Sequence, residues 1–189
     1  MKIHNWDDLP QMSLAVDITG GKKTALTIGV FDGLHRGHQA LISKITAKSP
    51  DLLPAVITFR EKPRSPAGTT DIITFKEKLI LLENLGVDLC LVIDFSEHFS
   101  TISGRVFLET LNRYLCPAYI VVGTNFHCGY RRDTDAGGFK KLAEGLRIET
   151  EIVVPVMEGG LPVSSSRIRK ALESGRAEEA ALLLGRSVE

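Results

Sequence analysis

The stretch from Thr24 to Gln39 constrains the fold more than any other part of this chain. Residues 25–30 are apolar and partly β-branched, and the run is too short for a helix and typical of a buried strand. A turn follows at Gly33, where glycine supplies a backbone conformation with positive φ. A His-x-Gly-His motif at residues 35–38 comes next, and apolar residues then recur at helical spacing. The stretch therefore predicts a strand, a tight turn and the N-terminus of a helix that carries two histidines.

This predicted helix N-terminus is a candidate anion site. Free backbone N–H groups and a partial positive charge favour anions at such an end. The imidazoles of His35 and His38 add hydrogen-bond donors, and their protonation would strengthen the hold on a phosphate. Two ordinary surface histidines beside a strand–helix turn are the alternative. The combination of a Gly-x-Phe-Asp-Gly turn with His-x-Gly-His is much rarer than a glycine turn alone, and it favours the phosphate site.

The rest of the chain repeats the alternation of strand and helix. Predicted strands lie at residues 25–30, 54–59, 87–94, 119–122 and 148–156, and predicted helices end near residue 50 or span 73–86, 105–115, 137–146, 164–174 and 177–184. Such alternation is typical of a parallel sheet with right-handed crossovers. We expect a single α/β domain over residues 1–189, Rossmann-like, with an open, mostly parallel five-stranded sheet and helices on both faces. The alternating piece Leu14–Ile18 predicts an edge strand or a lead-in to the first strand.

Composition sets limits on partners and location. The formal net charge is zero, so nothing global favours nucleic acid or an anionic membrane as a partner, and local groups must meet any anionic ligand. The three cysteines lack the spacing of a metal site, and we expect buried, reduced thiols and no zinc. The N-terminus lacks the apolar region of a signal peptide, and no apolar run approaches the length of a membrane span. These features predict a cytoplasmic protein.

Three serines and two arginines open a later predicted helix. Ser164, Ser165 and Ser166 precede an apolar-periodic stretch, with Arg167 and Arg169 in its first turns. Helix capping alone explains serines at this place. Hydroxyl, backbone N–H and guanidinium donors in a small volume also suit a second phosphate site. The residues by themselves favour the two interpretations about equally.

Two loops follow predicted strands and face the same end of the sheet. Gly123 and Asn125 come directly after one strand, where turn chemistry is the commoner explanation for an asparagine. The loop from Arg60 to Asp71 follows another strand, and ligands of open parallel sheets sit beyond the carboxyl ends of the strands. Lys62 in this loop could meet a phosphate as a point charge.

These motifs together resemble those of the nucleotidylyltransferase superfamily. More narrowly, residues 29–38 resemble the signature of the FMN adenylyltransferase (FAD synthetase) module of bacterial bifunctional riboflavin kinase/FAD synthetases. Residues 163–169 are similar to its Ile-Ser-Ser-Thr-x-Ile-Arg motif, and residues 123–126 to its Gly-x-[Asn/Asp]-Phe motif. The resemblance runs from about residue 24 to Arg186. One loop departs from the family, because Glu61 and Lys62 stand where it usually has proline and histidine.

The resemblance implies the reaction of ATP with FMN to give FAD and pyrophosphate, with Mg²⁺ bound to the phosphates. It implies catalytic roles for His35, His38, Asn125, Ser165, Ser166 and Arg169. It implies nucleotide or flavin binding by Gly29, Phe31, Asp32, Gly33, Gly37, Lys62, Gly123 and Ser164. No dedicated protein site for a metal is expected, and Asp32 is the nearest acidic candidate for the Mg²⁺ that accompanies ATP.

Two other hypotheses about the function are compatible with the sequence. A sibling nucleotidylyltransferase would use another phosphate acceptor, such as pantetheine phosphate or nicotinamide mononucleotide, and the altered loop at Lys62 favours it mildly. A regulator that binds nucleotide or flavin without catalysis is the second alternative, which the intact His-x-Gly-His motif and Arg169 disfavour. In bifunctional members of the family a riboflavin kinase domain follows, and we expect none within residues 1–189, so that such a domain is separate or missing.

Overall fold

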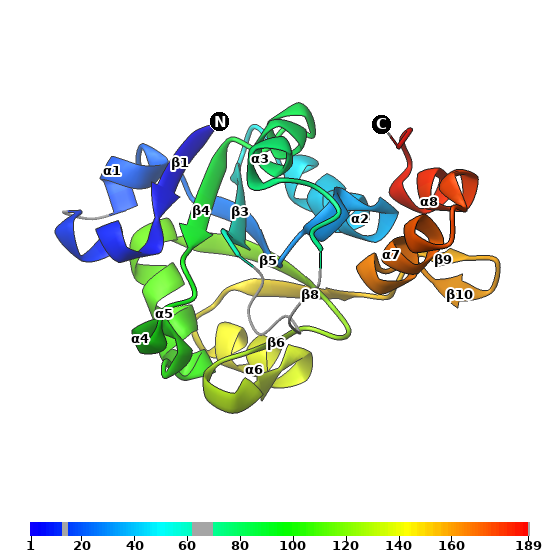
Figure 1. The fold of residues 1–189 in the computed structure, drawn as a ribbon. Coiled ribbons are helices and arrows are strands. Elements are labelled where there is room, and N and C mark those ends of the chain that lie inside the picture. The colour runs from blue at the N-terminus through cyan, green and yellow to red at the C-terminus, as the bar shows by residue number, and fades with distance from the viewer. Residues whose placement is uncertain (13–14, 62–69, 189) are drawn as a thin grey trace.

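The computed structural model describes residues 1–12, 15–61 and 70–188. Six parallel strands form its main sheet (Figure 1). In their order across the sheet they are β1 (Lys2–Asn5), β4 (Leu89–Ile93), β3 (Leu53–Phe59), β2 (Thr24–Ile28), β5 (Pro117–Gly123) and β8 (Glu149–Val153). The pairings are parallel throughout. The predicted α/β class and open parallel sheet are confirmed.

The sheet has one strand more than the sequence pattern predicted. The additional strand β1 pairs with β4, with Lys2 opposite Leu89. The edge strand predicted at residues 14–18 is wrong, because the chain forms the short helix α1 (Ala15–Thr19) there, and residues 13–14 lie outside the described part. Val16 is 64% exposed whereas Ile18 is fully buried. Residues two apart share a side of a strand but point in different directions on a helix, so this burial pattern requires the helix.

Helices cover both faces of the sheet (Figure 1). The helices after α1 are α2 (Arg36–Thr46), α3 (Phe75–Asn84), α4 (Glu97–Ser100), α5 (Gly104–Leu115), α6 (Ala136–Gly145), α7 (Ser165–Glu173) and α8 (Ala177–Leu184). Short 3₁₀ turns occupy Trp6–Gln11, Asp32–Leu34 and Tyr130–Arg132. Two small hairpins complete the fold, β6 (His127–Cys128) with β7 (Thr134–Asp135) and β9 (Met157–Glu158) with β10 (Leu161–Pro162).

Each sheet face has its own apolar core. Ile42 and Ile45 of α2 and Leu82 of α3 pack on one face with Val56 and Val121. The other face packs against residues of α5 and α6, among them Phe107, Leu111 and Phe139. Burial of these side chains from both sides explains why the strands read as continuous apolar runs.

Helix α3 shows how directly a local sequence signal can act. The Thr74 hydroxyl accepts the backbone N–H of Glu77, and the Glu77 carboxylate accepts the backbone N–H of Thr74. These two bonds form the capping box that the sequence predicts. Leu82 is fully buried, and Leu79 and Leu85 pack partly buried against the same core.

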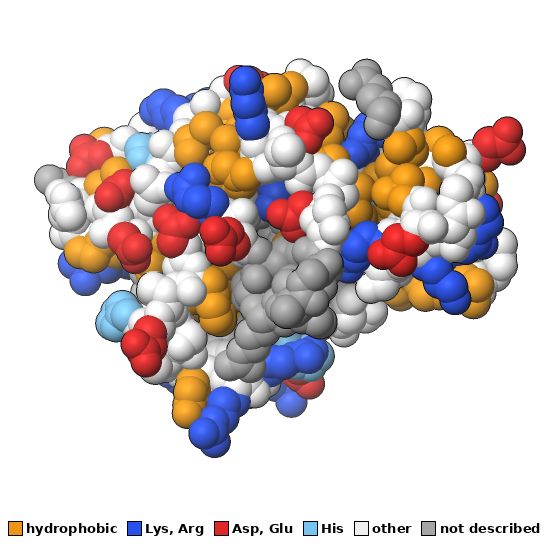
Figure 2. All heavy atoms as spheres, viewed as in Figure 1, with side chains coloured by type: hydrophobic (Ala, Val, Ile, Leu, Met, Phe, Trp, Pro, Cys, Tyr) orange, Lys and Arg blue, Asp and Glu red, His pale blue; other side chains and the backbone are white. Residues whose placement is uncertain are grey.

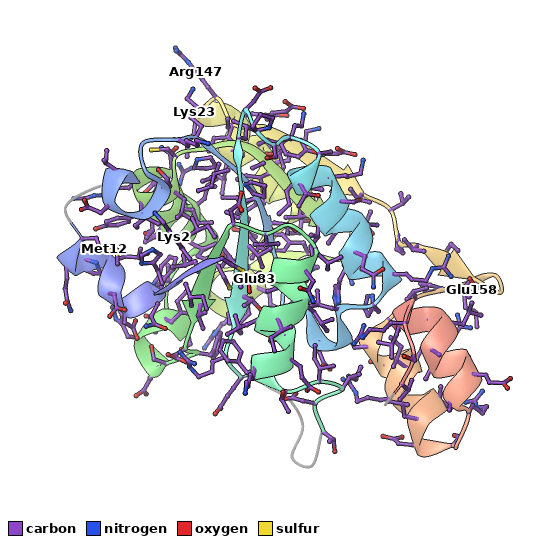
Figure 3. All side chains as sticks on the ribbon, turned by 90° about the horizontal axis from the view of Figure 1, so that it is seen from above. Lys2, Met12, Lys23, Glu83, Arg147 and Glu158 are labelled. Carbon is purple, nitrogen blue, oxygen red and sulfur yellow. The ribbon has the colours of Figure 1, made fainter. Side chains whose placement is uncertain are left out.

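Helices α7 and α8 form a small unit beside the sheet. Their own apolar cluster contains Val163, Ile168 and Leu183, with Ile72 and Val156 packed against it. Seen from above, this unit lies next to Glu158, at the opposite end of the molecule from Met12 (Figure 3). Besides the apolar contacts of Ile72 and Val156, polar contacts with the turn after β2 attach the unit to the sheet, and they belong to the site.

The surface charges, the lengths of the helices and the burial of the cysteines can be compared with the predictions made from composition. Acidic and basic side chains intermingle on the face drawn in Figure 2, in keeping with the zero net charge. Among the described residues no helix is long and apolar enough to span a membrane. All three cysteines are free thiols, but only Cys90 is buried; Cys128 is partly buried and Cys116 is exposed, contrary to the expectation of buried thiols.

Strand order places the site. The central strand β2 has β3 on one side and β5 on the other, so the direction of winding reverses next to it. The loops that leave the carboxyl ends of two such strands diverge to opposite faces and open a crevice between them. The glycine turn and His-x-Gly-His motif follow β2, and the Asn125 loop follows β5.

Candidate active site

A cavity of about 610 Å³ lies at the carboxyl ends of the central strands. Of the predicted site residues, those that line it are Gly29, Phe31, His38, Gly123 and Asn125. The first three come from the turn after β2 and from α2, and the last two from the loop after β5. The structure thus brings together two motifs that are almost 90 residues apart in the chain.

His35 and His38 form a stacked pair at the start of α2. The ring centroids are 3.6 Å apart with an interplanar angle of 14°. His35 is the N-cap residue, and its Nδ1 accepts the backbone N–H of His38 at 3.3 Å. Because Nδ1 acts as the acceptor, the neutral His35 ring carries its proton on Nε2 and can donate from there. Phe31 packs edge-on against His38, with the two ring centroids 5.2 Å apart.

Both imidazoles are uncharged at neutral pH. Burial lowers the pKa of His35 to about 4. Burial also holds the pKa of His38 well below its ordinary value, and the nearby His35 and Lys78 lower it further. The expectation that protonation strengthens phosphate binding is therefore corrected, because desolvation disfavours the charged rings. The Nδ1 atom of His38 is buried with no hydrogen-bond partner among the described residues.

The glycines of the motif make room for its own side chains. A Cβ atom at Gly29 would lie 3.1 Å from the Phe31 ring, and one at Gly37 would lie 3.1 Å from the His35 ring. Gly33 has a φ of +80°, and its Cβ would meet Ile72 at 3.1 Å. The family resemblance implies nucleotide or flavin binding by these glycines. In this structure Gly29 and Gly37 allow the close packing of Phe31 and His35 in the motif, whereas Gly33 lies against Ile72.

Asp32 joins this turn to the N-terminus of α7. Its Oδ2 atom forms an ion pair with Nη1 of Arg169 at 2.6 Å, and its Oδ1 atom accepts the backbone N–H of Ile72 at 2.9 Å. The Ser165 hydroxyl donates to the backbone carbonyl of Asp32 at 2.9 Å. The two candidate phosphate sites of the sequence, one on α2 and one on α7, are thus in direct contact. Ser165 and Arg169 lie outside the lining of the cavity.

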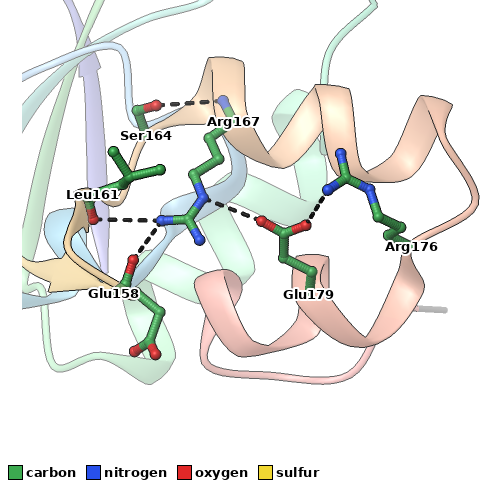
Figure 4. A network of polar contacts seen from close by, with 6 residues as sticks. All are labelled: Glu158, Leu161, Ser164, Arg167, Arg176 and Glu179. Carbon is green, nitrogen blue, oxygen red and sulfur yellow. Dashed lines mark hydrogen bonds and ion pairs between the residues drawn. The ribbon is translucent and has the colours of Figure 1, made fainter.

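The other polar residues at the start of α7 have different partners and do not all face the motif after β2. Ser164 caps the helix by accepting the backbone N–H of Arg167 at 3.3 Å, whereas Ser166 is exposed. Arg167 bridges to Glu179 of α8 at 3.2 Å and donates to the Glu158 carbonyl at 2.7 Å (Figure 4). Arg167 therefore holds the small unit together, and of the two arginines only Arg169 reaches the motif after β2.

Of two further predicted site residues, the structure describes Asn125 but not Lys62. Asn125 is exposed on the cavity wall, and a Cβ at Gly123 would lie 3.1 Å from its Oδ1 atom. Gly123 therefore lets the asparagine fold back over the end of β5. Lys62 lies outside the described residues, so its assignment stays a prediction.

Sequence reasoning missed the aromatic lining of the cavity. Phenylalanine side chains supply much of this surface, namely Phe59, Phe95, Phe99, Phe107 and Phe126. Phe59 ends β3, Phe95 follows β4 and Phe126 follows β5. A search for aromatic residues at the carboxyl ends of the predicted strands could have found these three. Arg132 also lines the cavity, and no role was assigned to it from the sequence.

The donor set offers no evident metal cage. In the described ranges no group of three or more histidine, cysteine or acidic side chains is placed to hold a metal ion. Both carboxylate oxygens of Asp32 are engaged, one by Arg169 and one by a backbone N–H. What the site offers is neutral imidazole, hydroxyl and guanidinium donors beside an aromatic cavity, a combination suited to an anion attached to a flat ring system.

Comparison with known proteins agrees with this chemistry. A family model described as FAD synthetase matches residues 18–167. A bifunctional riboflavin kinase/FMN adenylyltransferase of Buchnera aphidicola is 31% identical over 170 residues, which cover 86% of this chain and 54% of that protein. The Escherichia coli K12 protein of the same name is 30% identical over 193 residues, covering 97% and 58%. The chain thus spans little more than half the length of these curated relatives.

Solved structures show the same fold. A crystal structure of a macrolide-efflux protein from Streptococcus pneumoniae superposes with a TM-score of 0.79 at 27% identity, covering all of this chain and 63% of that one. A pantoate-β-alanine ligase from Francisella tularensis superposes with a TM-score of 0.57 at 14% identity, covering 98% and 85%. The second likeness concerns the fold alone.

Proposed function

Because the chain belongs to the FAD synthetase family, we propose that it transfers the AMP moiety of ATP to FMN, giving FAD and pyrophosphate. A phosphate oxygen of FMN attacks the α-phosphorus of ATP, and the bond to the β-phosphate breaks as pyrophosphate leaves. The names of the relatives support this half of their activity. We propose no kinase activity for residues 18–167, so the FMN is supplied by a riboflavin kinase activity outside that region.

One observation carries the proposal, the stacked His35–His38 pair at the N-terminus of α2, of which His38 lines an aromatic cavity. The nucleophile is already anionic near neutral pH, so the reaction needs neither a general base nor a protein nucleophile. Alignment of the two phosphates and stabilisation of the charge that develops are then the main catalytic tasks. Neutral imidazole donors and the backbone N–H groups of a helix end suit both tasks.

Ser165, Ser166 and Arg169 are assigned to the departing pyrophosphate. Arg169 is paired with Asp32 by one nitrogen, and the remaining N–H groups of a guanidinium can still bind phosphate oxygens. The contact of Ser165 with the turn after β2 places this helix end next to the histidine motif. The two helix ends then hold the polyphosphate from two sides.

The cavity is assigned to the flavin. Six phenylalanine rings among its lining residues suit a large flat heterocycle, which can stack or make edge contacts with them. Asn125 on the wall offers both a donor and an acceptor to the heteroatoms of the ring or its side chain.

Mg²⁺ is proposed as the counter-ion of ATP, where it neutralises charge on the phosphates. This ion keeps several waters and is bound mainly through substrate phosphates in many sites of this kind. We assign it no protein ligand, because the oxygens of Asp32 are taken by Arg169 and by Ile72. The cytoplasmic location stays a prediction.

A direct assay tests the proposal. The chain is incubated with ATP, Mg²⁺ and FMN, and FAD and pyrophosphate are quantified by chromatography and a coupled assay. Formation of both in equal amounts is expected. Pyrophosphate released only with pantetheine phosphate or nicotinamide mononucleotide would instead indicate a sibling transferase. Binding of FMN and ATP without turnover would indicate a regulator.

His38→Ala is the first variant to measure. Loss of a preorganised donor at the reacting phosphates should lower kcat/KM by about 10²- to 10³-fold. The fold should persist, because His38 lines the cavity and its Nδ1 atom has no hydrogen bond to lose among the described residues. His98→Ala is the matched control, since His98 is exposed on the short helix α4. Equal activity of the two variants would remove His38 from the catalytic assignment.

A further inference from the structure

The cavity has a single cationic side chain among its described lining residues, that of Arg132. Aspartate and glutamate are missing from that lining. Burial raises the pKa of the Cys128 thiol to about 12, so this side chain brings no negative charge either. The lining is otherwise apolar or neutral. A ligand that is part aromatic ring and part anion therefore finds its one full opposite charge at Arg132.

The loop that carries Arg132 is shaped by several specific contacts. The hairpin of β6 and β7 closes through Gly129, at φ +82°, and through Arg131 and Arg132, at φ +53° and +63°. Left-handed backbone at residues other than glycine persists only where the surroundings impose it.

Asp133 supplies that constraint. Its Oδ1 atom accepts the backbone N–H of Gly104 at 3.1 Å and the hydroxyl of Thr134 at 2.8 Å. Gly104 is the first residue of α5, so the loop is fixed to a helix that packs in the core. A Cβ at Gly129 would lie only 2.0 Å from the same Oδ1 atom, which shows how closely the chain is folded there. The position of Arg132 is therefore built into the fold.

The contact that holds the guanidinium leaves it available. Nη2 of Arg132 lies 3.0 Å from Nδ1 of His127, and that Nδ1 also lies 3.0 Å from the carbonyl oxygen of Asn125. One ring nitrogen cannot serve both, because it must accept from the arginine but donate to the carbonyl. Within the described part of the chain no carboxylate pairs with Arg132, and Asp135 nearby caps α6 instead. An anion in the cavity can thus replace a weak, contested partner.

We propose that Arg132 binds the phosphate group of FMN and thereby selects the phosphorylated flavin over riboflavin. The inference rests on the proposed function and adds a specificity-determining residue to it. A cavity lined by phenylalanine would hold the flavin ring of both compounds about equally well. Only FMN carries a dianionic phosphate, to which a guanidinium makes charge-assisted hydrogen bonds. By offsetting this charge, Arg132 also lets the FMN phosphate approach the anionic α-phosphate of ATP.

Binding of FMN and riboflavin, each followed by quenching of flavin fluorescence, tests the assignment. Wild type should bind FMN more tightly than riboflavin. In Arg132→Met the affinity for FMN should fall by about 10- to 100-fold, the usual loss for a hydrogen bond to a charged group, with riboflavin binding unchanged. Arg132→Lys should keep part of the preference. Arg131→Met is the control, because Arg131 shares the left-handed backbone but lies over the ring of Tyr130 and outside the cavity lining.

Turnover separates this inference from the proposed function. In the assay with ATP and Mg²⁺, Arg132→Met should raise the KM for FMN while the KM for ATP stays near that of wild type. A wild type that prefers FMN through Arg132 but forms no FAD would overturn the proposed function alone. A wild type that forms FAD, with the FMN preference retained in Arg132→Met, would overturn the role of Arg132 alone. A chain that binds neither flavin would overturn both.

Discussion

At position 35 one imidazole performs two structural tasks. It caps α2 through Nδ1 and stacks on His38, and the cap requires a ring whose Nδ1 carries no proton. Because Nδ1 accepts a backbone hydrogen bond, Nε2 keeps the proton and can act as a donor. The residue type thus fixes the tautomer through local geometry. The charge state follows from burial, which the sequence does not display.

The lowered pKa of His35 predicts acid sensitivity of the fold. Its folded pKa of about 4 lies below the ordinary value of 6.5, so between these values the unfolded chain binds more protons. Stability from the neutral ring is present above pH 6.5 and is lost as the pH falls towards 4. We expect the free energy of unfolding of wild type to lose about 2 kcal/mol from this residue between pH 7 and pH 5.

His35→Asn isolates this contribution, since asparagine can cap the helix but does not titrate. Urea unfolding at pH 7, 6 and 5 gives the difference in stability between the two proteins. That difference should shift by about 2 kcal/mol in favour of the variant as the pH falls. A constant difference across the series would show that His35 titrates near its ordinary pKa.

At the scale of elements, the hairpin of β6 and β7 depends on one position. Gly129 combines a φ of +82° with a Cβ site that is already filled by Asp133 and by the backbone nitrogen of Gly104 at 2.3 Å. The hairpin, the start of α5 and the cavity wall therefore meet where no other residue type fits. The contact gives the physical reason for a glycine at this position.

Gly129→Ala should be strongly destabilising and should open the cavity wall. Strain at the left-handed position and the clash with backbone together predict a loss of about 3 kcal/mol or more in the free energy of unfolding. Gly145→Ala is the matched control. Gly145 ends α6 with nothing within 4 Å of its Cβ site, and alanine there should change stability by about 1 kcal/mol or less. Thermal or chemical denaturation of the two variants compares them, and similar losses would contradict the clash.

Elements with strong local signals were predictable from the sequence. The capping box at Thr74 and Glu77 sets the start of α3 through bonds between residues only three apart. Residues 14–18 show the limit, because alternation over five residues fits a strand as well as a helix turned towards the core. Strand β1 was missed for a similar reason. It is a four-residue edge strand that β4 selects through backbone pairing, and its side chains carry little pattern.

At the scale of the whole molecule, the α7–α8 unit is joined to the sheet domain by polar contacts around the turn after β2. Arg169 pairs with Asp32, Arg36 pairs with Glu158 at 2.5 Å, and the Gln39 amide donates to the carbonyl of Leu184 at 2.8 Å. These contacts join the first and the last quarter of the chain at the proposed polyphosphate site. ATP bound at that site would contact some of the same residues.

Asp32→Asn should weaken the attachment of the α7–α8 unit to the turn after β2. Removal of the carboxylate leaves Arg169 without its buried partner, while the backbone N–H of Ile72 can still find an amide oxygen. We expect the amides of α7 and α8 to exchange hydrogen about tenfold faster or more, with a smaller effect on β2 and β5. Hydrogen exchange followed by mass spectrometry measures both regions. Asp51→Asn, at an exposed residue, is the control. A uniform change in exchange rate over the whole chain would contradict a local role of Asp32 in attaching the unit.

The sequence by itself determined the α/β class, the motif after β2 and the residue types that meet a phosphate, because these signals are local or periodic. Only the tertiary structure decided that both histidines are neutral and that Asp32 ties Arg169 to the motif. It also decided that phenylalanines from separate strand ends line one cavity with Arg132 at its wall. Burial, pairing and cavity shape depend on segments far apart in the chain, and no single stretch of sequence contains them.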